Sequence, residues 1–69
     1  MRISARNQLS GTITAIELGE VMAMVTLELE GGQRVTAAIT RASVEELGLT
    51  VGALATAVIK STEVMIGVD

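Results

Sequence analysis

The chain lacks cysteine, histidine and proline, and it contains no Phe, Tyr or Trp. Without cysteine it can form no disulfide, and without cysteine and histidine it lacks the ligands that zinc prefers. Its eight acidic residues are scattered singly apart from Glu45 and Glu46, which disfavours a calcium site or a catalytic pair of carboxylates. A nucleophilic serine or threonine would have no obvious base, and Lys60 is the one side chain that could serve as one. We therefore expect a protein that is not an enzyme and that binds no metal as a free cation.

The absence of aromatic residues also argues against nucleic-acid binding. Small barrels that bind single strands usually stack the bases on aromatic rings above a positively charged groove. This chain has a formal net charge of −3 and no run of basic residues. We expect no nucleic-acid partner, and a nucleic-acid-binding barrel is the weakest of the alternatives.

Long apolar runs are missing as well. Charged or polar residues interrupt every apolar stretch before it reaches the ~20 residues that a membrane-spanning helix needs. The segment Met1–Gln8 has no apolar stretch of the kind found in a signal peptide. We therefore expect a cytoplasmic protein that does not contact the membrane.

The chain is short but strongly apolar. Its 69 residues make one domain, residues 1–69, and a domain of this size buries only about 60% of the surface that its unfolded chain exposes. The 49% of hydrophobic residues gives more apolar surface than so small a domain can hide. Because neither a disulfide nor a metal is available to add stability, we expect the chain to form a homo-oligomer.

Alternation of apolar and polar residues is the dominant pattern, and it indicates half-buried strands. In the segment Met22–Leu29, for example, Ala23, Val25 and Leu27 face one way, while Met22 and Met24 face the other. Glycines mark the connections between such segments. The pattern predicts five strands, at Leu9–Leu18, Met22–Leu29, Gln33–Ile39, Ala53–Lys60 and Glu63–Val68.

One stretch, Thr40–Gly48, departs from this alternation and predicts a short helix. It offers an N-cap at Thr40 or Ser43, a capping-box spacing between Ser43 and Glu46, and a terminal glycine. Five strands with one short helix between the third and the fourth are typical of an all-β, OB-type Greek-key barrel. The ferredoxin-like alternative would need two helices.

Three short clusters contain hydrogen-bond donors and no acidic residue: Ser4–Gln8, Thr40–Ser43 and Lys60–Thr62. A fully deprotonated oxyanion accepts hydrogen bonds and cannot donate them, so its site should present N–H and O–H groups and exclude carboxylates. Each cluster also has an ordinary interpretation, as a helix cap or as a solvated cation at a strand end. We expect Arg2, Arg34 and Arg41 to be surface charges, and Met22 and Met24 to lie in the core or in a subunit interface.

At these clusters the sequence resembles the molbindin family of small molybdenum-pterin-binding proteins, over essentially the whole chain. The resemblance begins with Ile3–Leu9 and Gly11–Ile13. It continues with Ile39–Thr40, Ser43 and Leu47–Leu49, and ends with Gly52 and Val58–Lys60. It implies an OB-type barrel that forms a homo-hexamer and binds molybdate or tungstate between subunits.

The resemblance also implies the residues of the oxyanion site. Arg6 and Lys60 would supply two positive charges against a dianion. The remaining donors would be the hydroxyls of Ser4, Thr40 and Ser43 and the backbone N–H groups near Ala5 and Ser61. Two departures from the family pattern are Ser10, where lysine is frequent, and Ser61–Thr62, where Ala-Ser is usual. We predict no bound pterin, because no aromatic side chain is available to stack on its ring.

These observations predict a protein that binds molybdate or tungstate inside the cell, for storage and homeostasis of the oxyanion. The alternative is a molybdate-sensing module that acts through a partner protein.

Overall fold

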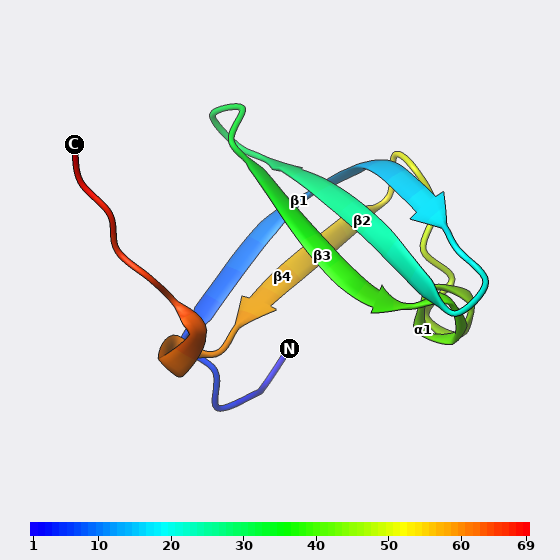
Figure 1. Ribbon diagram of the computed structural model, residues 1–69, viewed down its shortest axis with the longest axis horizontal. Helices are drawn as coiled ribbons and strands as arrows, with labels where there is room; N and C mark the ends of the chain where they lie inside the picture. The colour runs from blue at the N-terminus through cyan, green and yellow to red at the C-terminus, as the bar shows by residue number, and fades with distance from the viewer.

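The computed structural model describes residues 1–69 and consists mainly of strands. In chain order the elements are β1 (Asn7–Leu18), β2 (Met22–Leu29), β3 (Arg34–Thr40), α1 (Arg41–Leu47), β4 (Leu54–Ile59) and the short 3-10 helix η1 (Ser61–Glu63) (Figure 1). The first four predicted strands and the predicted helix are therefore confirmed, with ends displaced by one or two residues. The helix is too short to cross a membrane, and no other α-helix is present.

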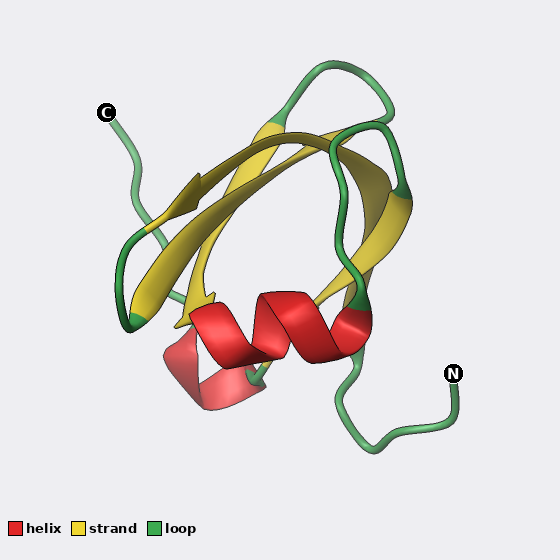
Figure 2. Cartoon of the chain, turned by 90° about the vertical axis from the view of Figure 1, so that its right-hand side faces the viewer, coloured by secondary structure: helices red, strands yellow, loops and turns green.

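The four strands form one antiparallel sheet in the order β3-β2-β1-β4. The sheet curls strongly (Figure 2), and α1 lies at the end of the half-barrel where β3 ends (Figure 1). Because β3 and β4 are both edge strands, the curled sheet does not close. The result is an OB-like half-barrel.

Strand β1 is the longest strand, and it lies between β2 and β4 in the sheet. Its first half, Asn7–Thr12, pairs with β4, and its second half, Gly11–Leu18, pairs with β2. The two pairings overlap at Gly11 and Thr12. At Gly11 a Cβ atom would lie only 2.7 Å from the backbone oxygen of Glu28. Only glycine permits this close approach of β1 and β2.

The core is confined to the concave face of the sheet. Five of the 69 residues are buried: Ile13, Ala23, Val25, Leu27 and Val44. Three of them are the alternate residues of β2 that the sequence pattern places on one face, which confirms that part of the prediction. Met22 and Met24, on the opposite face, are 49% and 43% exposed, so they do not belong to the core of the chain. The thin core agrees with the expectation from chain length.

The predicted fifth strand, Glu63–Val68, is wrong for the single chain. Residues 61–63 form η1 instead, and residues 64–69, which we call the C-terminal tail, run away from the sheet without pairing (Figure 1). The tail leaves Met65, Ile66 and Val68 about nine-tenths exposed. Apolar alternation makes a segment suitable for a strand, but a strand also needs a neighbour to bond with, and η1 directs the tail away from β4. The predicted five-stranded barrel is therefore an open, four-stranded one.

Candidate functional site

Two of the three donor clusters meet at one end of the sheet. Asn7, the first residue of β1, is paired with Ile59, the last residue of β4. The segment Ser4–Arg6 directly precedes this pair and Lys60–Ser61 directly follows it, so the two segments lie side by side (Figure 1). We call this region the basic end.

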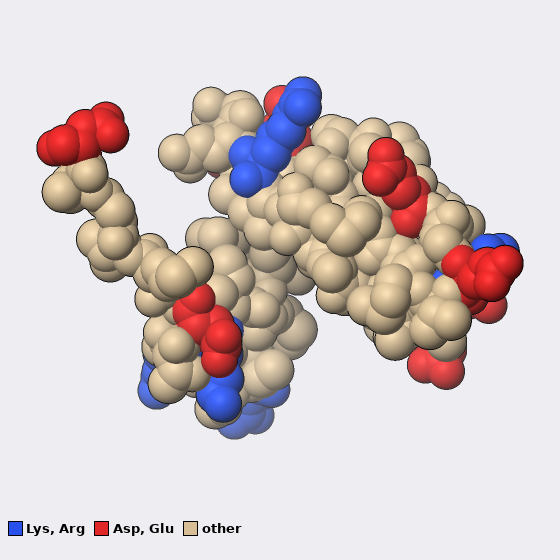
Figure 3. Space-filling model, in the orientation of Figure 1, with Lys and Arg blue, Asp and Glu red and all other residues tan.

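The basic end carries positive charge that the chain itself does not neutralise. Arg6 and Lys60 are both exposed, and neither forms an ion pair, because the structure contains one salt bridge and this joins Arg41 to Glu45. Figure 3 shows several blue side chains at the lower end of the molecule, with an acidic one beside them, and further blue side chains at the upper and right-hand edges. Glu63, in η1, is the one acidic residue of the adjoining turn. Two free cations in a small area suit a dianion.

Hydrogen bonds from two side-chain amides organise this end. Asn7 Nδ2 donates to the backbone oxygen of Ile59 at 3.2 Å and, at the longer distance of 3.4 Å, to Ser61 Oγ. Gln8 Nε2 donates to the backbone oxygen of Ala5 at 2.8 Å. Both amides belong to a predicted donor cluster, but neither was among the residues predicted for the site. Their role depends on the pairing of β1 with β4, for which the sequence gives no direct signal.

The third cluster lies at the start of α1. Thr40 is the N-cap: its Oγ1 accepts a hydrogen bond from the backbone N–H of Ser43 at 3.0 Å, and the two hydroxyl oxygens are 2.7 Å apart. The predicted alternative, with Ser43 as the cap and Glu46 closing a capping box, is wrong, because Ser43 lies within the first turn. One hydroxyl proton is used between Thr40 and Ser43, so the pair has one proton left to donate.

The structure does not bring this third cluster to the basic end. Thr40 is paired with Met22, beyond the point where β1 ends, whereas Arg6 and Lys60 lie before the point where β1 begins. The twelve residues of β1 separate the two positions, a contour of about 40 Å at ~3.3 Å per residue. One chain therefore presents two halves of the predicted donor set at opposite ends of its sheet.

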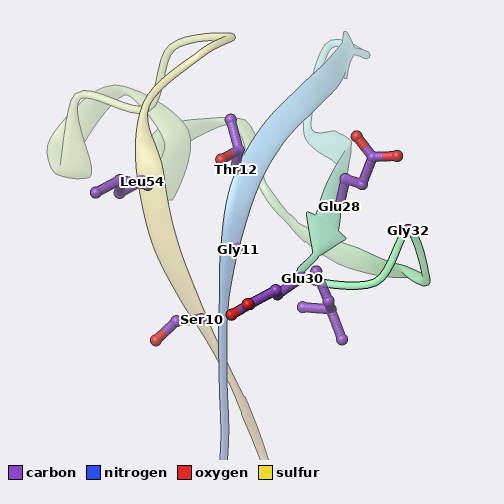
Figure 4. A pocket seen from close by; sticks show the side chains of 8 residues that line it. Ser10, Gly11, Thr12, Glu28, Glu30, Gly32 and Leu54 are labelled. Atoms are coloured by element: carbon purple, nitrogen blue, oxygen red, sulfur yellow. The ribbon is translucent and has the colours of Figure 1, made fainter.

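A hollow next to β1 has the wrong charge for an oxyanion. Eight residues line it, among them Ser10, Thr12 and the acidic residues Glu28 and Glu30, and none of the eight is cationic (Figure 4). Ser10 is one of the positions at which the sequence departs from the family pattern. Two carboxylates without a cation would repel a dianion, so the basic end is the better candidate.

The concave face of the half-barrel forms an apolar groove of about 900 Å³. Fifteen of its 19 lining residues are hydrophobic, and the groove reaches from Leu47 and Leu49 near α1 to Lys60 at the basic end. Its walls include alternate residues of the two edge strands, Val35, Ala37 and Ile39 on β3 and Ala55, Ala57 and Ile59 on β4.

The accessible surface is large for a chain of this mass. It measures 5511 Å², whereas the scaling relation for folded monomers gives about 4,100 Å² at 7.1 kDa. The open groove and the extended tail are the source of this excess, because both expose apolar groups that a closed barrel would cover. A single chain therefore leaves uncovered surface of the sort that subunit contacts bury.

The chain is similar to known proteins over nearly its whole length. The family model described as "TOBE domain" matches residues 3–66. Molybdenum-pterin-binding protein 1 of Clostridium pasteurianum is 54% identical over 66 residues, covering 96% of this chain and 97% of that protein. The probable molybdenum-pterin-binding protein of Haemophilus influenzae is 48% identical over the full length of both chains. A structure of the cytoplasmic molybdate-binding protein ModG with molybdate bound superposes with a TM-score of 0.95 and 52% identity, over the whole of this chain and 49% of that one.

Proposed function

The chain belongs to the molbindin family of TOBE-domain proteins, and from this premise we propose that it binds molybdate or tungstate in the cytoplasm for storage and homeostasis. The whole chain, residues 1–69, acts as the binding domain of a homo-oligomer, which we expect to be a hexamer. Arg6 and Lys60 neutralise the dianion, and hydroxyl and backbone N–H groups hold its oxygens. The proposed ligands beyond these two cations are Ser4, Ala5, Thr40, Ser43 and Ser61. No catalytic step and no bound pterin are part of the proposal.

The positions of the two halves of the donor set support a site between subunits. Thr40 and Ser43 lie at one end of β1, and Arg6 and Lys60 lie at the other. A tetrahedral oxyanion spans a few ångströms and cannot reach both. The donor set becomes complete where the basic end of one copy meets the helix start of another, and a closed ring of identical chains repeats that junction.

The tail and the groove supply a contact that holds such copies together. Val64, Ile66 and Val68 alternate with Met65 and Gly67, so one face of the extended tail is wholly apolar. The groove has apolar walls and two unpaired strand edges. A tail from a second copy, placed between β3 and β4, would pair with both edges and close the barrel. This arrangement also provides the fifth strand that the sequence pattern predicts.

Titration calorimetry tests the proposed ligand. Molybdate and tungstate should bind tightly, and sulfate, which is smaller but carries the same charge, should bind more weakly. Molybdate binding no stronger than that of sulfate would contradict the proposal.

Two charge-removing variants test the site itself. Arg6→Ala and Lys60→Ala should each abolish tight binding and leave the oligomer intact, because both side chains are exposed and form no ion pair within the chain. Arg34→Ala, which removes an exposed cation from the start of β3, is the matched control and should bind as the wild type does. Full affinity in both test variants would place the pocket elsewhere.

A further inference from the structure

At the basic end two side-chain amides donate within the chain, and the two cations are left free. The side chains of Asn7 and Gln8 direct their N–H groups at three acceptors: the backbone oxygens of Ile59 and Ala5, and Ser61 Oγ. Arg6 and Lys60, which can only donate, have no partner in the chain. An approaching anion therefore meets two free cations, and Ser61 Oγ beside them already accepts a hydrogen bond from Asn7.

The bond between Asn7 and Ser61 also fixes the direction of a hydroxyl. An amide Nδ2 can only donate, so Ser61 Oγ must accept in this contact. The proton of the Ser61 hydroxyl is then not used on Asn7 and points to another acceptor. Ser61 is exposed and next to Lys60, so an oxyanion bound by Lys60 is in position to accept that proton.

We propose that Asn7 is a positioning residue that determines specificity: by donating to Ser61 Oγ it keeps the Ser61 hydroxyl as a donor, and so selects fully deprotonated oxyanions over hydrogenphosphate. The inference rests on the proposed function and deepens it. At neutral pH molybdate has no proton, whereas phosphate retains at least one and needs an acceptor in its site. A Ser61 hydroxyl that donates to the ion offers no lone pair to that proton, and a phosphate proton left unpaired there is costly once the ion is desolvated.

The variant Asn7→Asp reverses this arrangement with almost no change of shape. The new carboxylate can only accept, so the Ser61 hydroxyl must turn and donate to it. The lone pairs of Ser61 Oγ then face the bound ion and can receive the proton of hydrogenphosphate. The variant should weaken molybdate binding and lower the ratio of phosphate to molybdate dissociation constants about ten-fold or more.

This ratio separates the proposed role from a structural one and from simple repulsion. Calorimetry gives the dissociation constant of molybdate, and displacement of bound molybdate gives that of phosphate. A loosened strand end weakens both ions together and does not move the ratio, and the effect of the added negative charge alone is measured in a Ser61→Ala background. In a Ser61→Ala background, Asn7→Asp should change the ratio less than about three-fold, because the hydroxyl through which it acts is gone.

Two further variants serve as controls. Gln33→Glu makes the same change from amide to carboxylate on the exposed loop between β2 and β3, and the ratio should stay at the wild-type value. Asn7→Ala removes the donor without adding an acceptor, so it should weaken molybdate binding and change the ratio less than Asn7→Asp does. Far-UV circular dichroism and oligomeric mass check that each variant is folded.

The outcomes distinguish this inference from the proposed function. A wild-type protein that binds molybdate, together with an Asn7→Asp ratio unchanged or lowered equally in the Ser61→Ala background, overturns the role of Asn7 alone. A wild-type protein that does not bind molybdate overturns the proposed function and this inference with it. A ratio that falls only when Ser61 is present supports both.

Discussion

Replacing Ile66 by aspartate should dissociate the oligomer, because it puts a charge on the apolar face of the C-terminal tail. In the single chain Val64, Ile66 and Val68 are 46%, 89% and 94% exposed. Covering a fully exposed side chain of this size contributes roughly 1.5–3 kcal/mol, so closing the groove with this face contributes about 5 kcal/mol per chain. Ile66 lies in the middle of the face, and a buried, unpaired carboxylate would cancel most of that contribution.

A loss of about 5 kcal/mol lowers an association constant more than about a thousand-fold. Light scattering after size exclusion would measure the mass, with refractive-index detection because the chain has no Trp or Tyr. We expect the wild type to elute as an oligomer and Ile66→Asp as a monomer, with a thermal midpoint that no longer rises with protein concentration.

Met65→Ser is the matched control for this experiment. Met65 is 91% exposed, like Ile66, but it belongs to the other face of the tail, together with Gly67. It should shift the association by less than about ten-fold, since only one side of the inserted strand faces the groove. An Ile66→Asp protein with the mass and thermal midpoint of the wild type would refute the proposal that the tail fills a groove.

Two further predictions concern the stability of the chain. Ile13→Ala removes the most deeply buried large side chain, 1% exposed, and should cost about 2–5 kcal/mol in the free energy of unfolding, read from denaturant titration by circular dichroism; an unchanged midpoint would show that the core lies elsewhere. Gly11→Ala places a Cβ atom 2.7 Å from the backbone oxygen of Glu28, so β1 and β2 must separate, and the thermal midpoint should fall by more than for Gly67→Ala, which meets no atom within 4 Å; equal midpoints would contradict the crowding.

The sequence predicted the strands well because each is half-buried. In β2 the alternation of Ala23, Val25 and Leu27 with polar or exposed residues follows directly from one face being covered, and the structure buries those three residues. The same reasoning failed for the tail. Its alternation is as clear as that of β2, but whether a segment forms a strand depends on a neighbour, which lies outside the sequence of one chain.

The candidate site, too, could be predicted only in part from the sequence. The donor clusters could be found from residue chemistry, because an oxyanion needs donors and excludes carboxylates. Their places in space could not, since it is the pairing of Asn7 with Ile59 that joins Arg6 to Lys60 and the pairing of Met22 with Thr40 that separates Thr40 from them. The role of Asn7 was missed for the same reason, because its hydrogen bonds span more than 50 residues of sequence.

The central claim is that two chains share each binding site, and mixed oligomers test it most directly. One parent would carry Arg6→Ala and Lys60→Ala, which removes the basic half, and the other Thr40→Val and Ser43→Ala, which removes the helix half. Neither parent should bind molybdate tightly. After the two are unfolded and refolded together, random assembly places two intact halves at about one junction in four, and that fraction of wild-type binding should return. If the mixture binds no more molybdate than its parents while mass analysis shows mixed oligomers, the site does not lie between chains.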